Sequence, residues 1–253
     1  MARRYDQRTT TFSPEGRLHQ VEYAIEAISH AGSVIGIQAK DGVVLAGEKK
    51  ETTKLVDPGK RGEKVYKIDD HVIVAVAGLT SDANALVNRA RINAQHYFSR
   101  YGENEPVEQL VVSLCDYKQQ YTQFGGLRPF GVSFMFAGWD RHFGFQLYQS
   151  DPAGNYTGWK ATAIGNNYSS AVPMLKQDWK EDMALDEAVH LAAKVLLKTT
   201  ESSSLTSDKC EFAVLTVKDG KVSHRMLTND EILAESKKLE QEQQQTTTTT
   251  TTS

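Results

Sequence analysis

The chain has 253 residues, enough for the core of one large domain, and its 40% hydrophobic and 24% charged residues are an ordinary globular composition. The net charge of -3 offers no basic surface for nucleic acid, and no apolar run is long enough to predict a membrane span. The N-terminus lacks the apolar stretch of a signal peptide, and Cys115 and Cys210 belong to no metal-binding motif. We therefore expect an intracellular, soluble protein without a cofactor.

The first predicted element is a turn followed by a helix. Ser13-Pro14-Glu15-Gly16 places a proline second and a glycine last, as a type I turn prefers. From Leu18 onward, apolar residues recur every three or four positions, at Leu18, Val21, Ile25 and Ile28. This spacing predicts an amphipathic helix, and by itself it indicates only a helix that closes a core.

Four strands in a row are predicted after this helix. The first two, at 33–38 and 42–47, are joined by Asp41-Gly42, a dipeptide typical of tight hairpin turns. A polar connection then leads to two further apolar runs, at 63–68 and 71–78.

A pair of helices follows, and the second half of the chain repeats this order. One helix begins near Thr80 and ends at Gly102, and the next begins at Pro106 and ends at Gly125-Gly126. Beyond them the sequence predicts strands at 131–138, 142–149 and 157–165, helices at 168–179 and 185–198, strands at 211–217 and 221–226, and a last helix from about Asn229.

This order predicts an α+β fold in which two sheets pack face to face with helices outside. From Glu240 onward there is no apolar residue, so burial cannot offset the entropy lost on ordering. We therefore predict an N-terminal tail and turn at 1–16, a single domain at 17–239 and a disordered, low-complexity tail at 240–253.

Two stretches carry a resemblance to a known family. YDQRTTTFSPEGRLHQVEYAIEA at 5–27 resembles the N-terminal signature of α-type subunits of the 20S proteasome, and GGLRPFGVS at 125–133 is similar to their internal motif. Details at 148–167 are most similar to the subunit type at the third α position. The resemblance covers the chain to about residue 240. It implies the four-layer αββα sandwich of the N-terminal nucleophile hydrolases with an extra N-terminal helix, matching the element order above.

The resemblance also bears on whether the chain is an enzyme. Hydrolases of this fold attack with the side chain of a processed first residue and use its free amino group as the base. Along the related catalytic β subunits, that position falls on Gly32, which has no side chain, while Glu48 stands at the acidic position and Lys64 at the activating lysine. We therefore expect no catalytic residue, and no other hydrolase or nucleotide-binding motif occurs. The alternative is cleavage that exposes Ser33 as the nucleophile.

For the N-terminus, the resemblance implies a gate. The tail would project toward the central pore of a seven-membered α ring, and Tyr5, Asp6, Pro14 and Tyr23 match the residues that hold the gate in the family. Many relatives have an arginine directly after the aspartate that matches Asp6. Here Gln7 stands at that position, and whether Arg8 takes the role of that arginine stays open. By local reasoning alone, the first residues would be a solvated chain end.

Lys64 has a second implied role. In α rings the matching lysine lines a pocket between adjacent subunits and receives the terminal carboxylate of an activator tail, and Gly78 allows close approach there. The local alternative is that Lys64 pairs with Glu63 or Asp69 on a surface strand.

Several partners follow from the resemblance: neighbouring α subunits, underlying β subunits that carry the peptidase sites, an activator or ATPase regulatory particle, assembly chaperones, and protein substrates in transit. The implied process is ubiquitin-dependent protein degradation in the cytoplasm and nucleus, with neither nucleic acid nor membrane as a partner. Two competing hypotheses remain, a hydrolase activated by cleavage before Gly32 or Ser33, and a free-standing peptide-binding module that would be a stable monomer.

Overall fold

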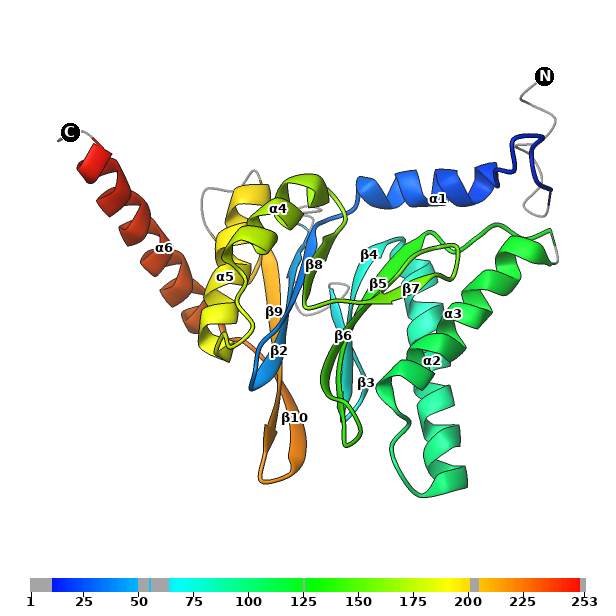
Figure 1. The fold of residues 1–253 in the computed structure, drawn as a ribbon. Coiled ribbons are helices and arrows are strands. Elements are labelled where there is room, and N and C mark those ends of the chain that lie inside the picture. The colour runs from blue at the N-terminus through cyan, green and yellow to red at the C-terminus, as the bar shows by residue number, and fades with distance from the viewer. Residues whose placement is uncertain (1–10, 50–54, 56–63, 125, 201–204, 251–253) are drawn as a thin grey trace.

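The computed structural model describes residues 11–49, 55, 64–124, 126–200 and 205–250. Within them, two five-stranded antiparallel sheets face each other (Figure 1). The first sheet has the order β10-β9-β2-β1-β8, with strands β10 Lys221–Met226, β9 Cys210–Lys218, β2 Gly42–Glu48, β1 Val34–Gln38 and β8 Ala161–Ile164. The second has the order β3-β4-β5-β6-β7, with strands β3 Val65–Asp69, β4 Val72–Gly78, β5 Val132–Asp140, β6 Gly144–Ser150 and β7 Tyr156–Gly158.

Helices cover the outer face of each sheet (Figure 1). On the first sheet lie α4 Tyr168–Asp178 and α5 Leu185–Thr199, and on the second lie α2 Thr80–Tyr101 and α3 Val107–Gln123. The two remaining helices are α1 His19–Ser29 and α6 Asn229–Thr250. The predicted α+β sandwich with four αββα layers and an extra N-terminal helix is therefore confirmed.

The layers are held by three buried apolar clusters, one between the sheets and one between each sheet and its helices. In the middle cluster Leu45 of the first sheet packs with Ile73, Met135 and Leu147 of the second. A Cβ atom added to Gly36 would lie 2.3 Å from the Met135 sulfur, so the sheets approach closely at this glycine. The sequence analysis predicted two sheets face to face, but not where they approach most closely.

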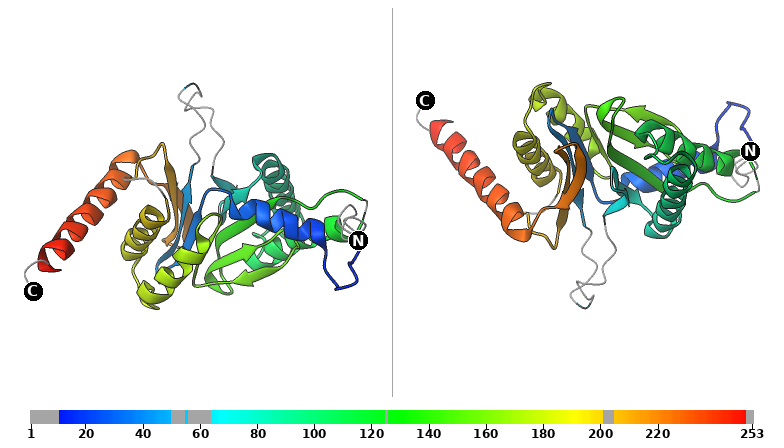
Figure 2. Two further views of the ribbon diagram at one scale, coloured as in Figure 1. Left: turned by 90° about the horizontal axis from the view of Figure 1, so that it is seen from above. Right: turned by 90° about the horizontal axis from the view of Figure 1, so that it is seen from below.

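Helix α1 and the turn before it cross the end of the second sheet (Figures 1 and 2). The predicted turn is present, because the Gly16 amide donates a hydrogen bond to the Ser13 carbonyl at 2.8 Å. Val21 and Ile28 are buried, but Ile25, which belongs to the predicted apolar stripe, is 45% exposed. The helix rests on the edge of the sandwich, so only a narrow part of its apolar face finds a partner.

The predicted single strand at 157–165 is wrong. Gly158 pairs with Tyr148 of β6 in the second sheet, whereas Ala161 pairs with Ile37 of β1 in the first. The chain therefore crosses between the sheets at Trp159-Lys160. A run of apolar and β-branched residues predicts extended backbone, but it does not say which sheet each half joins.

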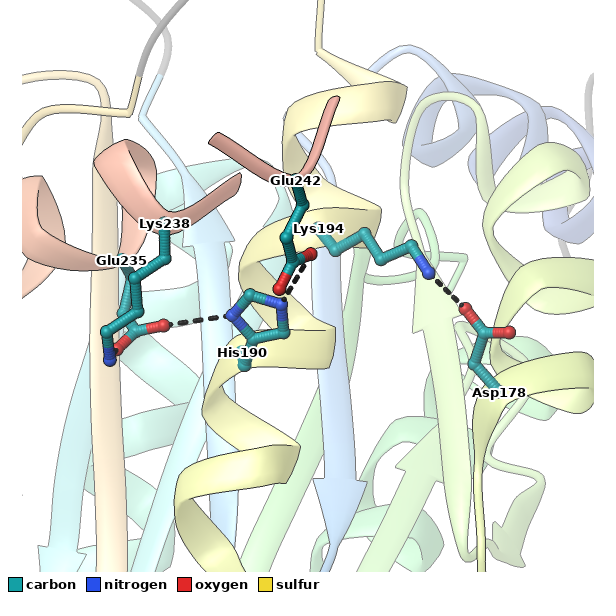
Figure 3. A network of polar contacts seen from close by, with 6 residues as sticks. All are labelled: Asp178, His190, Lys194, Glu235, Lys238 and Glu242. Atoms are coloured by element: carbon teal, nitrogen blue, oxygen red, sulfur yellow. Dashed lines mark hydrogen bonds and ion pairs between the residues drawn. The ribbon is translucent and has the colours of Figure 1, made fainter. Parts of the chain in front are cut away.

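The C-terminal helix corrects the predicted boundary at residue 240. Helix α6 continues to Thr250, and Leu239, only 2% exposed, packs with Ile232 into the cluster around α5. His190 of α5 contacts Glu235 and Glu242 of α6 through its two ring nitrogens, at 3.1 and 3.2 Å (Figure 3). The far end of α6 stands away from the sandwich (Figure 2). The glutamates and glutamines at 240–245 are good helix formers, which favours a helix there without further apolar residues, whereas the threonines at 246–250 are weak ones.

Candidate functional site at the start of the first strand

Three residues distant in sequence meet where α1 leads into β1. The Lys64 ammonium nitrogen donates a hydrogen bond to the Gly32 carbonyl oxygen at 3.0 Å. A Cβ atom added to Gly32 would lie 3.4 Å from that nitrogen but only 2.7 Å from the Glu48 carbonyl oxygen. The predicted layout of Gly32, Glu48 and Lys64 is therefore assembled, but the backbone leaves no room for a side chain at position 32.

Ser33, the hydroxyl of the alternative hydrolase hypothesis, has structural partners. Its side chain is buried, and its Oγ donates to the Asn166 carbonyl oxygen at 2.6 Å. Its backbone N–H donates to the Glu48 carboxylate at 3.0 Å. In this chain the Ser33 nitrogen is a peptide amide, which cannot act as the base of an N-terminal nucleophile.

Neighbouring residues fix the direction of the Lys64 side chain. Gly47 gives it space, because a Cβ there would lie 2.5 Å from the Lys64 Cγ. The Glu211 carboxylate accepts hydrogen bonds from the Lys64 and Val65 amides at 2.8 and 3.0 Å. Glu211 also forms an ion pair with Lys49 at 2.6 Å.

Of the two predicted surface partners of Lys64, only Asp69 is described, and its carboxylate pairs with His71. Lys64 is directed at Gly32, while the Asp69 carboxylate lies 3.6 Å from the His71 ring. Glu63, the other predicted partner, is outside the described residues. The lysine therefore points inward, toward the start of β1.

Gly78 is the last residue of β4, and Lys64 precedes β3 at the same end of the second sheet. The two strands are joined there by a hydrogen bond of 3.1 Å from the Val76 amide to the Lys64 carbonyl oxygen. The φ of +133° at Gly78 favours glycine. A Cβ at position 78 would lie 2.1 Å from the Gly131 carbonyl oxygen, so the close approach at this glycine comes from the chain itself.

Asp82 makes a structural contact that the sequence reasoning missed. Arg128 donates two hydrogen bonds to it, at 2.6 and 2.8 Å, and the Gly131 amide adds a third at 2.9 Å. The Arg128 hydrogen bonds hold the pKa of this carboxyl below its usual range. The internal motif at 125–133 is thereby tied to the first turn of α2. An acidic residue in a predicted first turn was the available signal.

Two of the predicted gate residues are described, and both lie on the surface. Pro14 is exposed in the turn. Tyr23 is 52% exposed, and its ring stacks on that of His19 with centroids 6.2 Å apart. Tyr5 and Asp6 lie outside the described residues. The structure therefore places two of the four predicted gate residues, and both are exposed.

The thiols and acidic side chains of the described ranges form no metal centre. These ranges hold no group of three or more histidine, cysteine, aspartate or glutamate side chains able to bind a metal. None of their helices is both long and apolar enough to cross a membrane. Cys115 and Cys210 are buried thiols, as predicted, and burial raises their pKa values to about 11 and about 12.

Comparison with known proteins identifies the family. The family described as "Proteasome subunit" matches residues 28–215, and the N-terminal signature of A-type proteasome subunits matches residues 5–27. The alpha type-4 proteasome subunit of Petunia hybrida is 62% identical over 92% of this chain and 93% of its own length. The protein of the same name from Spinacia oleracea is 65% identical over 89% and 91%. The alpha type-4-A proteasome subunit of Arabidopsis thaliana is 67% identical over 84% and 85%. The chain belongs to the proteasome subunit family and carries the N-terminal signature of its A-type members.

Proposed function

We propose that this chain is a non-catalytic subunit of the α ring of the 20S proteasome core particle, at the third α position. The observation that carries this function is the arrangement around Gly32. The lysine and glutamate of the hydrolase layout are present, but the nucleophile position holds a glycine whose Cβ direction is filled by the Glu48 carbonyl. A subunit of this kind builds the ring and admits substrates without cleaving them.

The N-terminal sequence and intact mass of the chain, recovered from its native assembly, test this proposal. We expect the chain to begin at Met1 or Ala2, apart from small modifications. The reason is that the segment before Gly32 forms α1, which packs on the end of the second sheet. A chain that begins at Gly32 or Ser33 would contradict it, since cleavage would supply the free amino group that such hydrolases need.

The gate belongs to the same proposal. We propose that the tail with Tyr5 and Asp6 restricts the ring pore, that Pro14 sets the exit direction of the tail, and that Tyr23 contacts a neighbouring tail. The exposed turn at Pro14 and the exposed Tyr23 ring support these roles. The proposed partners are adjacent α subunits, β subunits, regulatory particles, assembly chaperones and substrates in transit. The proposed location is the cytoplasm and nucleus.

Lys64 and Gly78 are proposed to form the pocket for activator tails. Lys64 is half-buried, and its ammonium carries three N–H donors, so one ammonium can bind the Gly32 carbonyl and a carboxylate together. A charge-assisted hydrogen bond of this kind contributes about 1.5 to 3 kcal/mol.

In the assembled ring we expect Lys64→Ala to weaken the binding of a peptide ending in a free carboxylate by roughly 10- to 100-fold. Fluorescence anisotropy with the labelled peptide measures this. Lys67→Ala is the matched control, because Lys67 lies on the neighbouring strand β3 and pairs with the exposed Asp70. Unchanged affinity in the Lys64 variant would exclude the pocket.

A further inference from the structure

A groove between α2 and α3 is lined by a buried glutamate, one of whose carboxyl oxygens has no hydrogen-bond partner among the described residues. The groove has a volume of about 690 Å³ and is lined by residues of both helices and by Glu105 of the loop that joins them. Glu105 is only 4% exposed, and its Oε2 atom has no hydrogen-bond partner in the described part of the chain. Leaving a buried polar atom unpaired is costly, so each such atom calls for an explanation.

The loop backbone directs Glu105 toward this groove. Its carbonyl oxygen accepts a hydrogen bond from the buried His71 ring at 2.7 Å, which anchors the loop to the start of β4. The residues on either side, Asn104 and Pro106, line a different, smaller cavity. Of these three loop residues, Glu105 is the one that lines the groove between the helices.

Aromatic rings form a wall of the groove beside this carboxyl group. Tyr97 and Tyr101, one helical turn apart on α2, have ring centroids separated by 4.5 Å. Both lie beyond Ala94, the last fully buried residue of α2, where the helix extends past its contacts with the core. Tyr101 is 59% exposed and the neighbouring Phe98 is 48% exposed. Exposed aromatic side chains gathered at a groove are typical of a protein contact surface.

In its ionised form, the Glu105 carboxylate beside tyrosine faces is complementary to a cation. Arginine fits best, because its planar guanidinium can stack on a ring while its N–H groups reach a carboxylate. Arg100 also lines the groove, yet Glu105 Oε2 stays without a hydrogen bond in the described structure, so Arg100 does not neutralise it.

We propose that this groove receives an arginine side chain of a partner protein, with its guanidinium bound by Glu105 and stacked on Tyr97 or Tyr101. The partner segment also covers the exposed rings of Phe98 and Tyr101. This binding is independent of the proposed ring function, because it depends only on the groove.

The cation site is tested on the full chain with a small probe. Nuclear magnetic resonance of ¹³C-labelled tyrosines follows titration with n-butylguanidinium, and n-butylurea serves as the neutral probe of the same shape. We expect saturating shifts of Tyr97 and Tyr101 with the cation only, and at least tenfold weaker binding in Glu105→Gln. Glu103→Gln, in the same loop, is the control and should bind as the unmodified chain does. The proposal would be overturned if n-butylurea bound as tightly as n-butylguanidinium, or if Glu105→Gln bound the cation undiminished. Neither result depends on assembly of the ring.

The partner is tested in cells with a photo-crosslinking phenylalanine analogue at Phe98. We expect mass spectrometry to find a cross-linked segment of another chain that contains an arginine. The same analogue at Phe143, an exposed aromatic on the turn after β5, should not give that product. Products confined to this chain, or a partner segment without arginine, would contradict the assignment.

Discussion

At the scale of single residues, the burial of Glu105 changes the pKa of its carboxyl group. The burial of Glu105, reinforced by the nearby Asp69 carboxylate, raises its pKa from 4.5 to about 7. The folded state therefore holds this proton more tightly than the unfolded chain does. The resulting stability is fully present below the unfolded pKa and is lost as pH rises through the folded pKa.

We predict that Glu105→Gln is more stable than the unmodified chain at pH 8, by up to about 3 kcal/mol, because the variant has no charge to bury. The difference should vanish below about pH 4.5, where the glutamate is protonated in both states. Urea unfolding of the isolated chain at the two pH values measures it. Parallel stability curves for the two proteins would show that Glu105 is hydrated in the folded state.

Among the elements, α6 depends on a small contact area. Among residues 229–242, Ile232, Ser236 and Leu239 are buried, and Leu205 packs into the same apolar cluster. The His190 ring contacts lie at the rim of this interface, where Glu235 is partly buried and Glu242 is exposed, and polar pairs at such a rim contribute little (Figure 3). Apolar burial should therefore dominate the docking of this helix.

We predict that Leu239→Ala weakens α6 docking by about 2 to 5 kcal/mol, the usual cost of such a buried truncation. Hydrogen exchange should accelerate across 232–242 while α5 stays protected, because α5 remains packed on the first sheet. Lys238→Ala is the control, since Lys238 is exposed and pairs with Glu235. If hydrogen exchange across 232–242 accelerated equally in both variants, the Lys238–Glu235 ion pair would contribute as much to the docking of α6 as Leu239 does.

Across the molecule as a whole, the exposed apolar residues indicate association. Phe12, Tyr23 and Ile25 are exposed on or next to α1, and Phe124 and Leu127 are exposed around the end of α3. These side chains belong to or adjoin the segments that carry the family signatures. A protein that functions alone would be expected to expose fewer of them together.

We predict that native mass spectrometry of the chain recovered from cells finds it in an assembly many times its own 28.1 kDa, since the family forms multi-subunit complexes. Recovery as a stable monomer would favour the free-standing peptide-binding module instead. Mass measurement separates these hypotheses without any variant.

Local patterns were enough to predict most elements and the family. The Ser13–Gly16 turn, the Asp41-Gly42 hairpin and most helices and strands depend on residues close together in the chain, so their patterns could be read directly. The family signature at 5–27 could be identified from the amino-acid sequence without any structural information. The same reasoning placed Glu48 and Lys64 around Gly32, because the family alignment carries that information.

The surroundings of those residues come from contacts between distant segments. The division of 157–165 between two sheets, the Glu48 carbonyl that fills the space at Gly32 and the burial of Glu105 all arise from segments far apart in the sequence. The extension of α6 past residue 239 likewise combines local helix propensity with the docking of Leu239 beside α5. Burial and strand pairing depend on how distant segments meet, and no pattern within one segment specifies its neighbour.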